Sequence, residues 1–313
     1  MKIVVDLMGG DNAPDFVIEG CEQFLSKIKD CSLELVGTKD AIERAKVLLP
    51  QQLCNFHEVE TVISMEDTPI SISKRKQNST ISYALNLLKN DIGDAFFSAG
   101  NSGAVIFLSL SIIGQKTDSV SPALLTLIPK SNMSFQVLLD VGASGNKLVT
   151  KDYLVYLAKS GSKFYKQFFE KDNPKIALLN IGEEKSKGTS IHVETHEILS
   201  NSEMNFIGNI EGDKIYDSDA DVLVVDGFTG NITLKLMESF YDIIMKRLEQ
   251  FKISELVKKS SLYPKNLEYE NIGGAYLLGI NKNIIIGHGK SSSKAIYSGL
   301  SFTRRVLKKK ILL

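Results

Sequence analysis

The segment Asp94–Gly103, D-A-F-F-S-A-G-N-S-G, contains residue types that can bind and orient an anion. Ala95–Phe97 predicts the end of a buried strand, and a turn of Gly, Ser and Asn residues follows before an apolar, helix-like segment. Such a turn lets backbone N–H groups converge at a helix N-terminus, which carries partial positive charge. The segment therefore predicts a phosphate site; the alternative is a tight strand-to-helix connection without a ligand.

Other glycine-containing turns also follow predicted strands. They contain Gly9–Gly10, Gly142–Gly145, Gly182, Gly227–Gly230 and Gly287–Gly289. In an open α/β sheet, ligands bind outside the carboxyl ends of the strands. We therefore expect the turns to gather along one edge and to form a phosphate-binding cleft.

The side chains of these turns suit a direct transfer, because the chain shows no obvious activated nucleophile. Amide and hydroxyl donors could hold a bound phosphate and the oxyanion that develops on an acyl carbonyl. Lysine would neutralise the phosphate, while Glu184 and His288 could handle protons. The predicted catalytic residues are Asn101, Asn231, Lys187, His288 and Glu184. The predicted substrate-binding residues are Asp6, Gly9, Gly10, Asp11, Ser98, Gly100, Ser102, Gly103, Asn180, Gly182, Thr229, Gly230 and Lys235.

The sequence argues against several other kinds of site. It lacks a dinucleotide fingerprint, and a Walker A loop ending at Gly289–Ser291 would need its first glycine at Ile284, inside a predicted strand. His192 and His196 share a helix face, but no H-E-x-x-H pattern accompanies them. We interpret them as surface or partner-contacting histidines and His57 as structural. No metal or cofactor is predicted.

The elements that would position these residues alternate along the chain. Strands are predicted at Lys2–Asp6, Leu33–Val36, Asn55–Val62, Ala95–Phe97, Pro122–Pro129, Phe135–Asp140, Lys175–Leu179, Asn205–Gly208, Asp221–Val225 and Lys282–Ile286. Helices are predicted between them, with Thr38 and either Ser79 or Thr80 as N-caps. This alternation predicts an α/β fold of three layers, α/β/α, with a mostly parallel sheet.

Length and composition limit the class of protein. The chain has 313 residues, 43% hydrophobic and 24% charged, which is enough for one large α/β domain or two smaller ones. We predict one domain over residues 1–313. A formal net charge of +0 gives no general case for nucleic-acid binding. Cys21, Cys31 and Cys54 lack metal spacing and are interpreted as reduced thiols of a cytosolic protein. We identify no signal peptide and no apolar run of membrane-spanning length.

An amphipathic helical protrusion is predicted at about 236–268. Its first part carries an apolar stripe of Met237, Phe240, Tyr241, Ile244, Leu248 and Phe251, of which we expect Met237 to Leu248 to pack on the sheet and on a partner subunit. Its second part places Ile253, Leu256 and Val257 beside lysines, a pattern that suits an anionic bilayer. The basic segment Arg304–Lys310 is the alternative membrane contact. A basic cluster at Lys74–Lys76 is either a solvated face or a cationic rim for a ligand or partner.

Eight motifs together resemble the bacterial phosphate acyltransferases of phospholipid synthesis, the PlsX family. In order they are D-L-M-G-G-D-N-A-P, F-F-S-A-G-N-S-G-A, L-L-D-V-G-A, L-L-N-I-G-E-E-K-S-K-G, F-I-G-N-I-E-G, D-G-F-T-G-N-I-T-L-K, G-G-A-Y-L-L-G-I and H-G-K-S-S-S-K-A-I. The resemblance covers nearly the whole chain. It implies an enzyme that converts fatty acyl–acyl carrier protein and inorganic phosphate to acyl phosphate and free carrier protein.

The resemblance also implies a fold similar to isocitrate/isopropylmalate dehydrogenases and phosphotransacetylases. It implies a cytoplasmic homodimer in peripheral contact with the membrane, whose product feeds a glycerol-3-phosphate acyltransferase. Three alternatives remain: a short-chain acyltransferase that uses coenzyme A, a non-enzymatic scaffold that docks carrier protein and acyltransferases, and a dehydrogenase. The missing nucleotide signature disfavours the dehydrogenase, and the ordered glycine turns disfavour the scaffold.

Overall fold

The structure is a computed structural model that describes residues 1–68, 71–72, 78–117, 121–144, 149–251 and 271–311. Some sequence-based predictions concern residues outside these ranges: the basic cluster Lys74–Lys76, Gly145, and the membrane contact at Ile253, Leu256 and Val257. These remain predictions.

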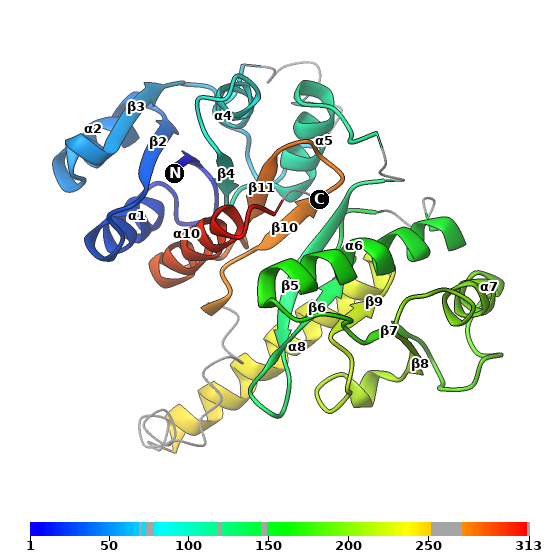
Figure 1. The fold of residues 1–313 in the computed structure, drawn as a ribbon. Coiled ribbons are helices and arrows are strands. Elements are labelled where there is room, and N and C mark those ends of the chain that lie inside the picture. The colour runs from blue at the N-terminus through cyan, green and yellow to red at the C-terminus, as the bar shows by residue number, and fades with distance from the viewer. Residues whose placement is uncertain (69–70, 73–77, 118–120, 145–148, 252–270, 312–313) are drawn as a thin grey trace. The chain divides into compact units, whose positions relative to one another are not determined.

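The chain folds into two compact units. The first combines Met1–Pro122 with Ile272–Leu313, and the second is the continuous segment Ala123–Asn271. Each unit has its own strands with helices packed on them (Figure 1). The expectation of a single domain over residues 1–313 with a protrusion at about 236–268 stays a prediction.

The first unit is built on parallel strands. Its elements are β1 (Lys2–Asp6), α1 (Asp15–Lys27), β2 (Ser32–Gly37), α2 (Lys39–Leu48), β3 (Cys54–Glu58), α4 (Thr80–Lys89), β4 (Ala95–Ser98), α5 (Ser102–Ile112), β10 (Ala275–Leu278), β11 (Asn283–Ile286) and α10 (Ser293–Lys308). The strand order is β3-β2-β1-β4-β11-β10, in which β10 alone runs antiparallel to its neighbour β11. The strand β10 was not predicted.

The helices of the first unit begin where the sequence predicts them. Thr38 accepts a hydrogen bond from the Ala41 N–H at 3.5 Å, and Ser79 accepts one from the Ser82 N–H at 3.3 Å, so both are N-caps. Helix α1 packs against α10 and α2, while α4 packs against α5. Right-handed crossovers place α1 and α2, which connect β1, β2 and β3, on one face, and α4, which returns from β3 to β4, on the other.

The second unit repeats this plan with one hairpin at its start. Its elements are β5 (Ala123–Pro129), β6 (Phe135–Leu139), α6 (Lys151–Phe169), β7 (Ile176–Leu179), α7 (Ser190–Ser200), β8 (Phe206–Ile210), β9 (Val222–Val224) and α8 (Gly227–Gln250). The order is β5-β6-β9-β7-β8, with β5 and β6 antiparallel and the other pairs parallel. The predicted α/β class with a mostly parallel sheet between helices is confirmed.

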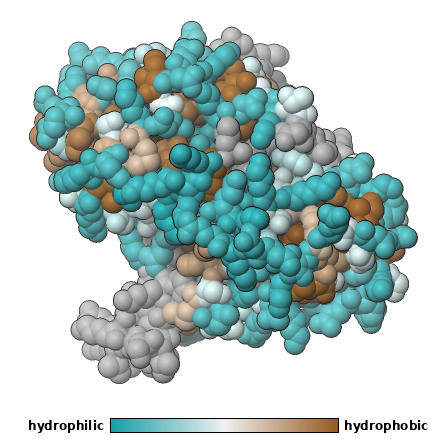
Figure 2. Space-filling view, viewed as in Figure 1, coloured by the Kyte–Doolittle hydropathy of each residue, from teal (hydrophilic) through white to brown (hydrophobic). Residues whose placement is uncertain are grey.

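The apolar stripe of α8 differs from the prediction in its packing on the sheet, while its packing on a partner subunit stays a prediction. Of its residues, Phe240, Ile244 and Phe251 are exposed in this chain, and Met237, Tyr241 and Leu248 are half-buried. The helix packs on β6 near its start and then extends beyond the strands, which is why the expected packing on the sheet does not form along its length. The face shown in Figure 2 is mostly hydrophilic, with scattered apolar patches. Within the described residues, no helix is long and apolar enough to span a bilayer.

Candidate functional site

Three turns at the carboxyl ends of β1, β4 and β11 lie together in the first unit. The Asp11 N–H donates to the Gly289 carbonyl at 2.8 Å, which joins the turn after β1 to the turn after β11. A Cβ added at Gly9 would lie 2.6 Å from the Gly100 backbone nitrogen, so only glycine permits this approach. The structure therefore brings together Asp6, Gly9, Gly10, Asp11, Ser98, Gly100, Asn101, Ser102, Gly103 and His288.

Asp6, at the end of β1, holds the turn after β4 through hydrogen bonds. Its buried carboxylate accepts hydrogen bonds from the Ser98 hydroxyl at 2.9 Å and from the Met8 N–H at 3.2 Å. The Ser98 oxygen in turn accepts from the Gly100 N–H at 3.0 Å. Burial raises the pKa of Asp6 above its usual range, with the Ser98 hydrogen bond acting in the opposite direction. The carboxylate is thus engaged with protein donors rather than directed at an anion.

Asn101 is the N-cap of α5, and its whole amide is engaged. The side-chain oxygen accepts from the Ala104 N–H at 3.0 Å. The side-chain nitrogen donates to the carbonyls of Ser64, Met65 and Asp67 at 2.9 to 3.2 Å. Its predicted role as a donor to substrate stays a prediction, and it would require this nitrogen to change partners.

His288 is exposed in the turn after β11. Its Nδ1 accepts from the Lys290 N–H at 3.2 Å, which places the proton of the neutral imidazole on Nε2. The Ser291 hydroxyl donates to the His288 carbonyl at 2.6 Å and closes the turn.

In the second unit, Asp140 organises the turn after β6. From its place in the sequence, Asp140 was predicted only as the end of a strand. Its buried carboxylate accepts hydrogen bonds, at 2.7 to 3.0 Å, from the N–H groups of Leu124, Gly142, Ala143 and Ser144 and from the hydroxyls of Ser144 and Tyr153. Burial, followed by the charge of Asp140, raises the pKa of Tyr153, so this phenol is a donor at all ordinary pH values.

The turn after β9 packs directly on that of β6. A Cβ at Gly230 would lie 1.9 Å from the Asp140 carbonyl oxygen, so the first turn of α8 can approach only because residue 230 is glycine. Asp226 caps α8 by accepting from the N–H groups of Phe228 and Thr229, both at 3.0 Å. Asn231 lies beside Gly142, and within the described part of the chain its side chain makes no hydrogen bond.

The turn after β7 carries the predicted cation. The Asn180 side chain accepts from the Ile181 N–H at 2.8 Å and donates to the Lys187 carbonyl at 3.0 Å, which closes the loop. The Lys187 ammonium lies 4.0 Å from the Glu184 carboxylate, and the two side chains are 47% and 67% exposed. Lys187 is therefore held at its backbone, while its charge stays accessible to an anion.

His196 corrects one sequence-based interpretation. It was predicted to be a surface or partner-contacting histidine, but α7 packs on β8 and leaves the residue only 6% exposed. Its Nδ1 lies 3.2 Å from the Asn209 side-chain oxygen, and the Asn209 amide donates to the Glu184 carbonyl at 3.0 Å. The pair therefore supports the loop that carries Glu184 and Lys187. His57 bonds to the buried Glu34 carboxylate at 2.9 Å, which agrees with a structural role.

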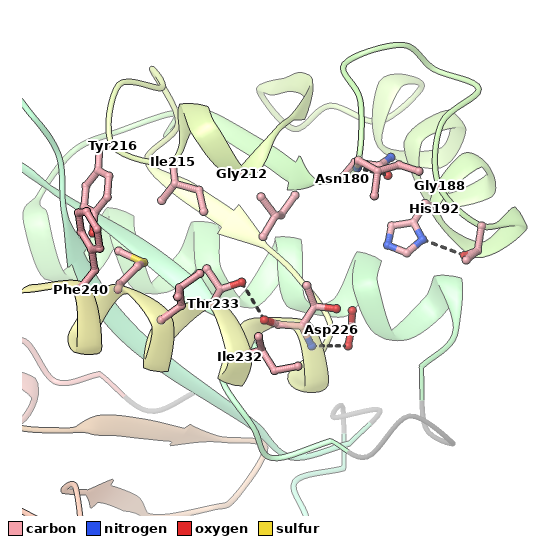
Figure 3. Close-up of a pocket in the computed structure, with 16 residues that line it drawn as sticks. Asn180, Gly188, His192, Gly212, Ile215, Tyr216, Asp226, Ile232, Thr233 and Phe240 are labelled. Atoms are coloured by element: carbon pink, nitrogen blue, oxygen red, sulfur yellow. Dashed lines mark hydrogen bonds between the residues drawn. The ribbon is translucent and has the colours of Figure 1, made fainter. Parts of the chain in front are cut away.

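A cavity of about 790 Å³ lies within the second unit, next to these turns (Figure 3). It is lined by the end of β7, the start of α7, the segment after β8 and α8 up to Phe240. Asn180 and Thr229, both predicted binding residues, form part of its wall. Other lining residues, such as Tyr216 and Ile215, were not predicted, because the walls come from elements far apart along the chain.

The predicted residues of the second unit are thus Asn180, Gly182, Glu184, Lys187, Thr229, Gly230, Asn231 and, further along α8 and exposed, Lys235. Each unit gathers its own glycine turns. The turns of the first and second units were predicted to share one edge, and this stays a prediction. Among the described residues, no three His, Cys, Asp or Glu side chains are grouped to hold a metal ion.

Comparisons with known proteins give consistent results over the full chain. The family described as "Fatty acid synthesis protein" matches residues 1–312. A protein named phosphate acyltransferase from Thermodesulfovibrio yellowstonii is 37% identical, with 99% of this chain and 92% of the relative covered. A phosphate acyltransferase from Staphylococcus aureus is 35% identical, with 96% of this chain and 92% of the relative covered.

Solved structures give the fold. A phosphotransacetylase from Streptococcus pyogenes matches with a TM-score of 0.63 at 17% identity, covering 98% of this chain and 94% of the other. A branched-chain phosphotransacylase from Enterococcus faecalis matches with a TM-score of 0.62 at 14% identity, covering 97% and 98%. At these identities the likeness concerns the fold alone.

Proposed function

Because this chain belongs to the phosphate acyltransferase family, and is therefore an acyltransferase, we propose that it transfers a fatty acyl group from acyl carrier protein to inorganic phosphate. The products are acyl phosphate and free carrier protein, and the acyl phosphate feeds phospholipid synthesis through a glycerol-3-phosphate acyltransferase. The observation that carries the proposal is the accessible Lys187 charge, on a loop whose backbone Asn180 holds beside an apolar cavity. This pairing suits an anion and an acyl chain in one site.

The proposed chemistry is a direct displacement. A phosphate oxygen attacks the thioester carbonyl, the C–S bond breaks, and the carrier thiolate leaves and takes up a proton. Lys187 would bind the phosphate as a point charge, and Asn231, whose amide is not engaged by described residues, would donate to the developing oxyanion. Glu184 and His288 remain the proposed proton-handling groups, and Asn101 the second amide donor.

Release of carrier thiol from palmitoyl–carrier protein tests this function. We expect release to require phosphate and to yield one acyl phosphate for each thiol. Palmitoyl–coenzyme A and butyryl–coenzyme A serve as comparison substrates, because a coenzyme A-dependent transacylase is the nearest alternative. Phosphate-dependent release from coenzyme A thioesters but not from carrier protein would replace the proposed function with that alternative.

Lys187→Ala is expected to raise the KM for phosphate by roughly 10- to 100-fold, because a hydrogen bond to a charged group contributes about 1.5–3 kcal/mol. The fold should survive, since the Asn180 side chain bonds to the backbone of residue 187 and not to its ammonium. Steady-state kinetics with varied phosphate measure the effect. Lys185→Ala, an exposed lysine of the same loop, is the matched control. Equal phosphate dependence in both variants would remove Lys187 from the site.

We further propose that the protein is a cytoplasmic homodimer that contacts anionic membranes peripherally through Ile253, Leu256 and Val257. The exposed apolar residues of α8 outside the cavity, among them Ile244 and Phe251, support an apolar contact on this part of the chain. The alternative membrane contact is the basic segment Arg304–Lys310. Two of its charges are already paired in the protein, because Arg304 and Lys308 contact the Asp30 carboxylate at 2.7 and 3.0 Å.

Changing Leu256 and Val257 together to glutamate is expected to abolish flotation with anionic vesicles while soluble acyl phosphate synthesis persists. Each carboxylate would resist insertion by desolvation and by repulsion from anionic lipid. The matched control changes Val47 and Leu48 to glutamate, an adjacent apolar pair that is exposed on α2. A folded double variant at 256 and 257 that still floats would move the contact to Arg304–Lys310.

A further inference from the structure

The cavity of the second unit has the size of a small-molecule site. Its volume of about 790 Å³ falls within the range of roughly 300–1,000 Å³ that is usual for ligand pockets. Its walls come from β7, α7, the segment after β8 and α8, all within the second unit. The cavity is open to solvent along an apolar rim, where Ile181 is 80% exposed and Ile232 is 52% exposed.

The two ends of the cavity differ in polarity. At the end near the strand termini lie Asn180, Asp226 and Thr229, together with His192. At the other end Tyr216 from the segment after β8 faces Phe240 of α8 (Figure 3). Burial lowers the pKa of His192, with Asp226 acting in the opposite direction, so the imidazole is neutral at neutral pH. The arrangement fits a ligand with a polar head and an apolar tail.

The length of the cavity fits a lipid chain. The wall formed by α8 runs from Thr229 to Phe240, about 16 Å at roughly 1.5 Å per residue. One leaflet of a bilayer contains about 15 Å of hydrocarbon, half of the usual core thickness of about 30 Å. A chain of the length found in membrane lipids would therefore extend along α8 from one end of the cavity to the other.

We propose that this cavity, bounded by Asn180 and Thr229 at one end and by Tyr216 and Phe240 at the other, holds the fatty acyl chain during transfer. The inference rests on the proposed function, and it adds where the chain lies and which residues limit its length. The thioester carbonyl is at the Asn180 end, beside the loop of Lys187, and the terminal methyl group is at the Phe240 end. Met237, which lines the wall between these ends, sets the preference for long chains.

The test uses two substitutions in the cavity and the same changes outside it. Met237→Trp fills the cavity, and Leu236→Asp places a carboxylate on a lining residue that is 68% exposed and therefore tolerant of change. Ile243→Trp and Ile243→Asp are the controls, on an exposed α8 residue that does not line the cavity. All assays use the full-length protein without vesicles, and light scattering follows its oligomeric state.

Two readouts are measured: binding of a dansyl-labelled undecanoic acid, displaced by palmitate, and kcat/KM for palmitoyl– and butyryl–carrier protein. We expect the cavity variants to weaken probe binding, and to lower the palmitoyl-to-butyryl preference, by roughly tenfold or more. Butyryl transfer should persist, because a short chain ends before Met237. The variants at Ile243 should resemble the wild type.

Unchanged probe binding and chain preference in both cavity variants would overturn the inference. Equal losses in the cavity and control variants, together with a changed oligomeric state, would overturn it in favour of a second copy of the chain seated on α8. The proposed function fails separately, if no carrier thioester gives acyl phosphate with the wild-type protein. Probe binding does not depend on turnover, so in that case it still decides whether the cavity takes an acyl chain.

Discussion

Asn231→Ala is expected to lower turnover by roughly 10²–10³, the usual effect of losing one oxyanion donor. The melting temperature should not change, because the Asn231 side chain makes no hydrogen bond within the described part of the chain. Steady-state kinetics and thermal unfolding measure the two quantities. Asn231→Asp is the matched variant, which keeps the size of the side chain and removes its donor, so it should lose turnover to a similar extent.

Asn101→Ala should give the same loss of turnover but also a lower melting temperature. The structural reason is that Asn101 caps α5, and loss of an N-cap costs about 0.5–2 kcal/mol. Asn101→Asp separates the two effects, since a carboxylate keeps the cap and loses the donor. If both alanine variants keep wild-type turnover, the proposed placement of the transition-state donors is wrong.

The second large effect concerns stability. Asp140→Ala is expected to lower the free energy of unfolding by more than about 3 kcal/mol, because several buried donors lose their acceptor and each unsatisfied group costs about 1–3 kcal/mol. Urea denaturation measures the change. Asp219→Ala is the matched control, since this exposed carboxylate pairs with the Lys175 ammonium at 3.0 Å and its loss should change stability little. Equal stability of the two variants would mean that water replaces the Asp140 carboxylate.

Local signals in the sequence account for most of the fold. Thr38 and Ser79 predicted helix starts correctly because an N-cap depends on one side chain and a backbone group three residues away. The strand Ala275–Leu278 was missed because it is short, follows two glycines and shows no alternation. Its pairing with β11 is visible only in the folded sheet.

The candidate site was predictable in part for the same reason. Glycine turns after strands are local patterns, and in each unit the structure brings them together. Asp140 and His196 were misjudged because their partners, such as Leu124 and Asn209, are separated from them in sequence. The cavity was not predicted, since its walls combine three helix or loop segments with the end of a strand. Burial of a polar residue, and the shape of a void, depend on such distant contacts.

The discontinuous first unit has a consequence for synthesis on the ribosome. Strand β4 lies between β1 and β11, but β11 belongs to the last segment of the chain, after the whole of the second unit. At about 5–20 residues per second, the second edge of β4 waits roughly 10–40 s for its partner. During that time Phe97 lacks the cover that Gly287 and Gly299 give it in the folded protein. An unpaired strand edge beside an uncovered aromatic ring favours association with other chains. A nascent chain stalled before β11 should therefore recruit chaperones, and one released after α10 should not.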